Sequence, residues 1–369
     1  MFNRTFLFLT ALLMPLAAKA ESIQYEYGGN LRAIAGYAET NGNFQSGQNH
    51  FHAPVIGNLN GSVIYNFNAE TSFKLATELK AETGSNADNL NFGKYGEEVY
   101  GKLQTKYGDF YIGQMQNPAA LLSVTRPNVS VWQITPAETA DFMENPNWKQ
   151  HNRTKYYSTL TSTAINTDGS SFKLAYFTPE FAGTTLGFGF TPENNANDGL
   201  TSKFSPYHNQ SAYHLVLYNS HSFDFADTEF YLAYADFNHS HKEYAGGFSL
   251  YRRGFTVFAS YRQTESYDYA VNSTYLSANT PAYYDAFRNG FAFNAGTSYE
   301  FALFTSVLSY FEAKAKNLPA RTRILTLHNS IKPYKHLGFY IGGGYAEFKS
   351  ADYRENRGPL VYTGLEFNF

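Results

Sequence analysis

The chain has 369 residues, with 28 basic and 31 acidic side chains, a formal net charge of −3 and no cysteine. This weakly acidic balance argues against a nucleic-acid-binding protein, and the lack of cysteine excludes disulfides, zinc–thiolate sites and cysteine nucleophiles. Aromatic residues make up 18% of the chain. Because they are interleaved with polar residues, they favour a sheet with one face toward lipid and the other toward water.

Residues 1–20, MFNRTFLFLTALLMPLAAKA, have the three-part layout of a secretory signal, with Arg4 before a short apolar run and Ala-Lys-Ala at the end. The apolar run is shorter than the roughly 20 residues of a membrane-spanning helix, so we expect cleavage after Ala20. Removing Arg4 and Lys19 leaves 26 basic against 31 acidic residues, a net charge of −5. The rest of the chain, 21–369, shows no linker and is predicted to form a single domain.

The chain after Ala20 breaks into short segments in which apolar and polar residues alternate. In residues 22–38, for example, Tyr27 and Leu31 share one face while Glu26 and Arg32 share the other. Strict alternation is the period of a half-exposed strand. Sixteen strands are expected, at about 22–38, 54–67, 71–83, 95–107, 109–116, 170–180, 183–193, 210–220, 227–238, 243–252, 255–264, 289–301, 303–314, 321–333, 337–348 and 358–369.

Short turns and long polar connections alternate along these segments, which is typical of barrels in the outer membrane. The longest connection, 117–169, follows the fifth strand. Closing the sheet removes the edges that sixteen open strands would leave. The pattern therefore predicts an all-β fold, a transmembrane antiparallel β-barrel of 16 strands. A soluble sandwich and an exported soluble barrel remain as alternatives.

The chain ends in an amphipathic strand, VYTGLEFNF, in which Leu365, Phe367 and Phe369 are alternate residues. In soluble domains the last residues are usually frayed. An apolar face that continues to the last residue indicates a strand that is docked. We expect it to pair with the first strand and close the barrel.

Four stretches resemble the trimeric general porins of Gram-negative outer membranes. They are EEVYGKLQTKYGDFYIGQMQNP (97–118), LAYFTPEFAGTTLGFGFTPE (174–193), SAYHLVLYN (211–219) and the terminal strand with Leu365, Phe367 and Phe369. The resemblance implies a homotrimer in the outer membrane, in contact with lipid and lipopolysaccharide. It also implies that the barrel-assembly machinery reads the three terminal apolar residues as a signal.

In this family the third loop folds inward and narrows the pore. The resemblance assigns that role to 117–169, within which NRTKYYSTLTSTA (152–164) is expected to form an extra hairpin. Loop carboxylates of the family face basic residues on the opposite wall. The corresponding carboxylates here are Glu138, Asp141 and Glu144, while Arg126 and Arg153 are candidates to pin the loop to the wall.

Strand parity provides candidates for the pore wall. The bases predicted to point inward are Arg32, Lys74, Lys80, Lys102, Lys106, Lys173 and Arg262. Gln114 stands where the family usually has an arginine, so the basic wall is thinner than in the usual pattern. The alternative interpretation is that these residues are ordinary solvated lumen charges. We expect weak cation preference or near neutrality, since a pore selects by width and by the field at its narrowest point.

Two histidine motifs, NHFH (49–52) and HSHKE (239–243), have the i, i+2 spacing of metal ligands on a strand. Neither comes with a third ligand, so no metal and no cofactor is expected. His214 and His328 are possible inward histidines, but nothing locates a nucleophile beside them, and no enzymatic activity is expected.

The predicted function is passive diffusion of ions and small hydrophilic solutes through an outer-membrane pore. A substrate-selective channel with a binding track in its lumen is the alternative.

Overall fold

The structure is a computed structural model. It describes residues 21–41, 51–83, 91–92, 98–125, 143, 146, 148–151, 154–157, 159–193, 211–238, 241–266, 289–316, 318–350 and 353–369. The expected signal, 1–20, lies outside these residues, as do Arg126, Glu138, Asp141, Glu144 and Arg153. The side chain of Lys80 also lies outside them. Within the described part of the chain, no helix is long and apolar enough to cross a lipid bilayer.

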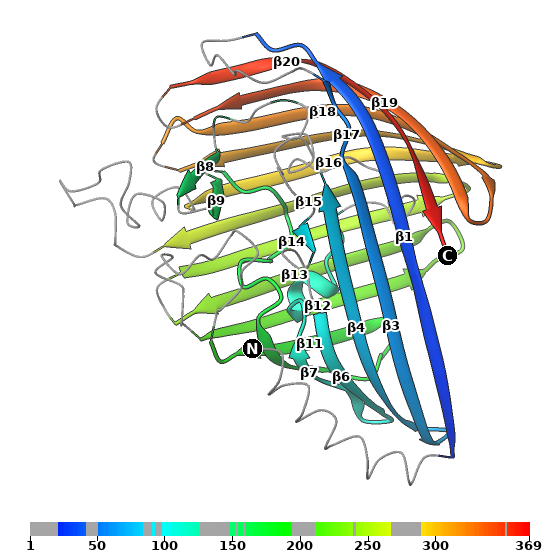
Figure 1. The fold of residues 1–369 in the computed structure, drawn as a ribbon. Helices are drawn as coiled ribbons and strands as arrows, with labels where there is room; N and C mark the ends of the chain where they lie inside the picture. Colours follow the sequence, from blue (N-terminus) through cyan, green and yellow to red (C-terminus); the bar gives the residue numbers. More distant parts are fainter. Residues whose placement is uncertain are drawn as a thin grey trace.

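The described strands form a closed antiparallel barrel (Figure 1). Two short strands, β2 (Phe51–His52) and β5 (Asn91–Phe92), also belong to the sheet. Apart from these, the barrel has sixteen strands among the described residues. They are β1 (Ser22–Ala38), β3 (Val55–Asn68), β4 (Thr71–Thr83), β6 (Glu98–Thr105), β7 (Gly108–Gln114), β10 (Phe172–Phe177), β11 (Thr184–Thr191), β12 (Ala212–Ser222), β13 (Asp227–Phe237), β14 (His241–Arg252), β15 (Phe255–Ser266), β16 (Gly290–Phe301), β17 (Phe304–Ala315), β18 (Arg321–Tyr334), β19 (Leu337–Lys349) and β20 (Glu355–Asn368).

The strand prediction is confirmed for all sixteen segments. Each observed strand begins and ends within three residues of the expected bounds. The expected faces are also present. On β1, Tyr27 and Leu31 are exposed on the outside of the barrel, whereas Ile34 and Ala38 are buried on the inside. Alternation therefore reports which side of the wall each side chain occupies.

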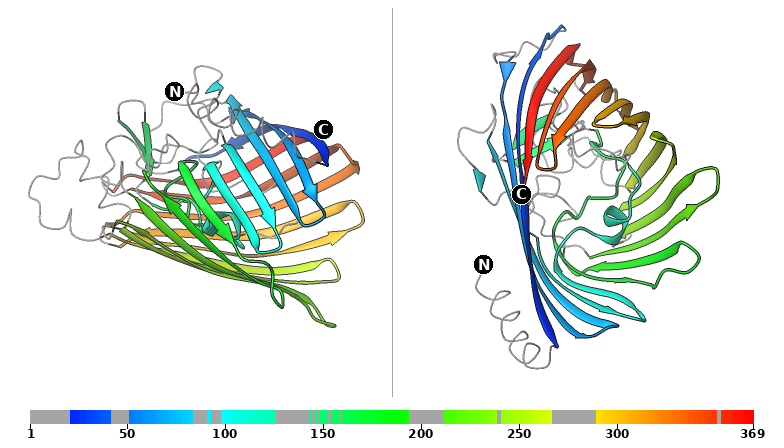
Figure 2. Two further views of the ribbon diagram at one scale, coloured as in Figure 1. Left: turned by 90° about the horizontal axis from the view of Figure 1, so that it is seen from below. Right: turned by 90° about the vertical axis from the view of Figure 1, so that its right-hand side faces the viewer.

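Short turns gather at one end of the barrel, together with both ends of the described chain (Figure 2). The β14–β15 turn shows how the sequence makes such a tight connection. Arg253 and Gly254 both have positive φ, 50° and 83°. Two successive residues with positive φ form the type of turn that matches the right-handed twist of paired strands.

The first and last strands pair and close the barrel, as expected. The register runs from Asn30 opposite Asn368 to Ala38 opposite Leu360. Beyond it, Gly29 and Phe369 exchange two backbone hydrogen bonds of 3.0 Å each. A Cβ at position 29 would collide with the ring of Phe369, which explains the glycine at this place. The aromatic end of the chain is thus part of the barrel seam.

The connection between β7 and β10 enters the barrel. It contains the short helix α2 (Pro118–Leu121), which lies inside the ring of strands (Figure 2). It also contains a separate hairpin, β8 (Trp148–His151) with β9 (Thr154–Tyr157). The extra hairpin is therefore present, but earlier than the expected 152–164. Residues 159–164 do not continue the hairpin, because their polar groups bind the barrel wall instead.

Candidate pore and the anchors of its inner loop

The two ends of the inner loop are joined to each other. Asn117 caps α2, with its side-chain oxygen accepting from the backbone N–H of Ala120. Its Nδ2 donates to Oδ1 of Asp168 at 2.6 Å and to the carbonyl oxygen of Ile165 at 3.0 Å. One asparagine therefore fixes the start of α2 and closes the base of the loop.

Asp168 is fully buried and binds three strands of the wall. Its Oδ2 accepts from Thr191 at 2.7 Å and lies 3.3 Å from both Lys173 Nζ and His214 Nε2. Burial opposes ionisation of this carboxyl. The Lys173 ammonium, His214 and the hydrogen bonds from Thr191 and Asn117 outweigh burial, and they hold the pKa of Asp168 below its ordinary value. The loop base is therefore held by a charged carboxylate.

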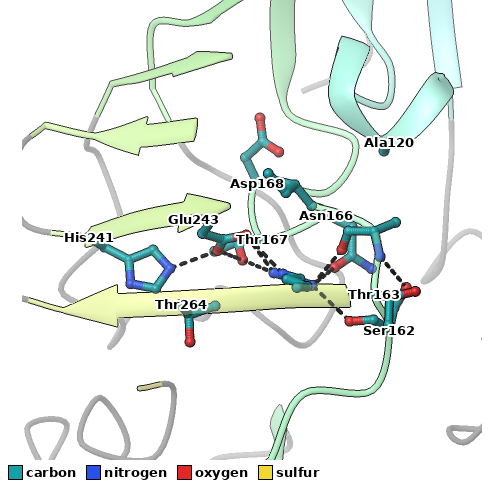
Figure 3. Close-up of polar contacts among 12 residues, drawn as sticks. Ala120, Ser162, Thr163, Asn166, Thr167, Asp168, His241, Glu243 and Thr264 are labelled. Atoms are coloured by element: carbon teal, nitrogen blue, oxygen red, sulfur yellow. Dashed lines mark hydrogen bonds and ion pairs between the residues drawn. The ribbon is translucent and has the colours of Figure 1, made fainter. Parts of the chain in front are cut away.

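A second buried polar cluster includes Thr167, His241 and Glu243 (Figure 3). Its centre is Arg262 on β15, which contacts both the wall and the loop. Its Nη2 donates to Glu243 Oε2 at 2.7 Å and to the hydroxyl of Thr167 at 2.7 Å. Its Nη1 donates to the carbonyl oxygen of Ala164 at 2.6 Å. Glu243 also accepts from the Thr167 hydroxyl and lies 2.7 Å from His241 Nε2. The guanidinium thus binds the wall and the loop together, in the planar geometry that suits arginine.

The returning limb of the loop, 159–171, follows the inner wall from strand to strand. Thr159 shares a hydrogen bond of 2.9 Å with Thr322 on β18, and Thr163 shares one of 2.7 Å with Ser260 on β15. The hydroxyl of Tyr231 on β13 donates to the carbonyl oxygen of Thr163 at 3.1 Å. Together with the two charged clusters, these bonds attach the limb to β10–β18.

The outgoing limb, 117–125, runs along the same side of the lumen. Pro118 lies against Gly189 on β11, where a side chain would collide with the proline ring. At the other end, Asn294 on β16 donates to the carbonyl oxygen of Thr125 at 2.7 Å. Both described limbs therefore cover the inner face of the wall between β10 and β18.

The opposite wall, β1 to β7, carries paired charges on its inner face. Lys74 Nζ lies 2.6 Å from Glu26 Oε2, and Lys102 Nζ lies 2.8 Å from Asp109 Oδ2. Lys74 and Lys102 are direct cross-strand partners. All four side chains keep part of their surface exposed, so this wall contributes charge to the lumen.

The predicted wall bases differ in what they do in the structure. Lys173 and Arg262 point inward but are buried under the loop and ion-paired, with 0% and 2% exposure. Arg32, Lys74 and Lys102 lie on the inner face of the β1–β7 wall. The proposed roles of the loop residues Arg126, Glu138, Asp141, Glu144 and Arg153 concern residues outside the described ranges.

Two wall assignments were wrong. Lys106 lies in the turn at the end of the barrel, because Thr105 bonds to Gly108 and ends β6 there. Gln114 lies on the outer side, since it pairs with Phe172, which is exposed, while the next pair, Lys173 and Gly113, faces inward. Gln114 has the same outward parity as Phe110 and Ile112, which are exposed on the outer face of β7.

The principal anchors were missed by the sequence analysis. Asn117 and Asp168 are 51 positions apart, and nothing local links them. Glu243 had a usable signal, because it has inward parity on β14 and lies diagonally across from Arg262 on β15. A search for opposite charges on one face of neighbouring strands would have found this pair.

A closed barrel of this size, apolar outside and polar inside, with a segment attached along its lumen, defines the class of outer-membrane channel proteins. A model of the Gram-negative porin family matches residues 8–351. The chain belongs to the Gram-negative porin family. It is a β-barrel pore of the outer membrane, through which ions and small hydrophilic solutes diffuse passively.

Solved structures agree with this fold. OmpF of Salmonella typhi in complex with daunomycin has 12% identity and a TM-score of 0.60, covering 94% of this chain and 97% of that chain. The anion-selective porin of Comamonas acidovorans has 13% identity and a TM-score of 0.58, covering 94% and 100%. OmpT of Vibrio cholerae in its trimer form has 10% identity and a TM-score of 0.57, covering 95% and 100%. No curated protein sequence matches the chain.

Proposed function

We propose that the chain is a general diffusion pore with a weak cation preference, and that solutes pass along the β1–β7 wall. The supporting observation is the burial of two ion pairs under the loop, Lys173 with Asp168 and Arg262 with Glu243, which leaves the exposed charges of the β1–β7 wall to act on ions in the lumen. The described side chains of β1, β3, β4, β6 and β7 carry four acids, Glu26, Glu78, Glu98 and Asp109, against three bases, Arg32, Lys74 and Lys102. This near balance favours only a small selectivity.

The loop carboxylates Glu138, Asp141 and Glu144 are proposed to face the β1–β7 wall and to add to the cation preference. Arg126 and Arg153 are proposed to hold the same loop. Transport occurs by diffusion through a fixed opening, without enzymatic turnover and without a cofactor or a metal. Width and field at the narrowest point then set the permeability.

A substrate-selective channel is the second candidate. The observation that favours it is an aromatic surface beside Lys102 on the wall. Tyr100 and Tyr111 have ring centroids 5.9 Å apart, and Lys102 Nζ lies 5.4 Å from the centre of the Tyr111 ring. Neighbouring rings and a cation would offer a ligand both stacking and charge.

The proposed assembly is a homotrimer, which the trimer form of the similar Vibrio cholerae OmpT supports.

Residues 1–20 are proposed to be a cleaved signal for export, ahead of a single barrel domain, 21–369. Leu365, Phe367 and Phe369 are proposed to be the signal for the barrel-assembly machinery. Their outward side chains would then contact lipid, while lipopolysaccharide would contact the outer face of the barrel toward the end with the long loops.

Single-channel recording in a planar bilayer under a salt gradient tests the proposed function. We expect openings in groups of three and a small reversal potential on the cation side. A reversal potential on the anion side would contradict the assigned path and preference. Flux of neutral sugars into liposomes separates the two candidates, because a diffusion pore gives linear flux whereas a binding track gives flux that saturates.

A further inference from the structure

Met143 belongs to the inner loop and is completely buried, with 0% exposure. It lies in a cluster of apolar side chains on the inner wall. From β1 the cluster contains Ile34 and Ala38, and from β20 it contains Leu360. The cluster extends over β16 to β19 as well, but Gly358 on β20 lies next to both Met143 and Glu39, the residue after β1, and this places Met143 beside the seam that closes the barrel.

The wall has a place for the end of this side chain. Gly358 on β20 has no side chain, and a Cβ there would stand 3.5 Å from the Met143 methyl group. Leu160, later in the loop, packs against the same cluster. An unbranched, polarizable side chain such as methionine fits irregular gaps of this kind.

This contact differs in place and in chemistry from the anchors described above. Those anchors are polar and charged, and they attach 117–125 and 159–171 to β10–β18. Met143 attaches the middle of the loop to the seam by burial alone. Attachment at Met143 as well as at the two ends divides the loop into two shorter spans, and a shorter span has less conformational freedom.

We propose that Met143 is a positioning residue that holds the middle of the inner loop on the β1–β20 seam and so keeps the pore opening constant. The inference rests on the proposed function, because it assumes that the loop narrows the path of the solutes. Burial of a methionine side chain corresponds to roughly a 10- to 100-fold bias toward the docked state. Loss of that bias would let the loop exchange between docked and undocked positions.

The docking itself is tested without measuring permeation. The chain expected after cleavage has two methionines, Met115 and Met143, and Gln24→Met, at an exposed position on β1, adds a third as the control. Folded Gln24→Met protein in liposomes is treated with hydrogen peroxide, and the oxidation of each methionine is followed by mass spectrometry. We expect Met143 to be oxidised at least about 10-fold more slowly than the methionine introduced by Gln24→Met, in line with the bias from burial. Equal rates would overturn the proposal, even if the pore conducts as proposed.

The effect on the pore is tested by recording Met143→Gln, Met143→Leu and the control Met115→Gln. Met115 is equally buried but packs with Ala175 and Phe177 at the base of the loop. We expect Met143→Gln to raise the rate of conductance fluctuations several-fold and Met143→Leu to restore the steady current. Equal fluctuations in Met143→Gln and Met115→Gln would assign the effect to general destabilisation and overturn the proposal. An unmodified channel that does not conduct would instead contradict the proposed function.

Discussion

The side-chain amide of Asn117 donates to the carboxylate of Asp168 at 2.6 Å and joins the first and last turns of the inner loop. The two residues are 51 positions apart, yet both are almost completely buried on the same wall. Asn117 starts α2, and Asp168 lies beside Lys173 just before β10. This pair therefore defines a closed base that joins the two described limbs of the loop, 117–125 and 159–171.

Replacing Asp168 with asparagine should strongly destabilise the barrel. Asp168→Asn leaves the buried ammonium of Lys173 without its counter-charge, which typically costs about 3–5 kcal/mol. The control is Asp109→Asn, because its partner Lys102 is partly exposed and the expected cost is about 0–1 kcal/mol. Denaturant unfolding followed by tryptophan fluorescence measures both. Similar costs for the two variants would contradict the assigned role of Asp168.

The stability of the loop base should depend on pH only in strong acid. The folded protein holds the pKa of Asp168 below its ordinary value of 3.8, so its stabilising effect is fully present above that value. The effect is lost as the pH falls through the lower pKa of the folded state. Unfolding free energies of the native chain and of Asp168→Asn should differ by a constant amount from pH 7 to about pH 4 and converge below it. Convergence already near pH 6 would show that Asp168 is not held in its charged form.

The pair of Arg262 and Glu243 should show strong coupling in a double-mutant cycle. Arg262→Met alone leaves a buried carboxylate without a counter-charge, whereas Arg262→Met combined with Glu243→Met removes both charges. The double variant should therefore be less destabilised than the sum of the two single variants. The coupling should exceed that of Arg323 and Glu312, a partly exposed pair at 3.0 Å, for which about 0–1 kcal/mol is expected. Equal coupling energies from unfolding experiments would argue against a special role for the buried pair.

Selectivity should respond to the lysines of the β1–β7 wall. One positive charge about 10 Å from a passing ion in water contributes about 0.4 kcal/mol, a factor of about two against cations and about two in favour of anions, so it changes the cation-to-anion permeability ratio about four-fold. Lys74→Gln and Lys102→Gln should each raise the cation-to-anion permeability ratio by about that factor. Lys106→Gln, in the turn beside Glu70, should change it less. The reversal potential in a salt gradient measures all three, and a larger shift for Lys106→Gln would contradict the proposed path.

The seam should be sensitive at both of its terminal partners. Deletion of Phe369 removes two backbone hydrogen bonds to Gly29 and the ring that covers it. Gly29→Leu places a side chain where that ring lies. Both changes should lower the yield of folded protein in outer-membrane fractions several-fold without changing the conductance of the protein that does assemble. Thr363→Ser is a mild control in the same strand. Normal yield after deletion of Phe369 would contradict the proposed assembly signal.

Most of the barrel was predictable because its signal is local. Side chains of a strand alternate between its two faces, so Tyr27, Leu31 and Tyr37 had to share the lipid side of β1. Glycine, asparagine and charged residues mark the turns for equally local reasons. The prediction is wrong at Gln114, because the resemblance places this residue on the pore wall whereas the parity of β7 turns it outward.

Local alternation along the chain predicts the sixteen strands, their two faces and the seam that ends at Phe369. The layout of residues 1–20 predicts an export signal. The tertiary structure decided which inward charges remain in contact with the lumen. Lys102 and Arg262 have the same inward parity, yet Lys102 is partly exposed and Arg262 is buried beneath Ala164 and Thr167. Their difference arises because a segment about 100 positions away in the chain lies over one and not the other, and strand alternation carries no information about such contacts.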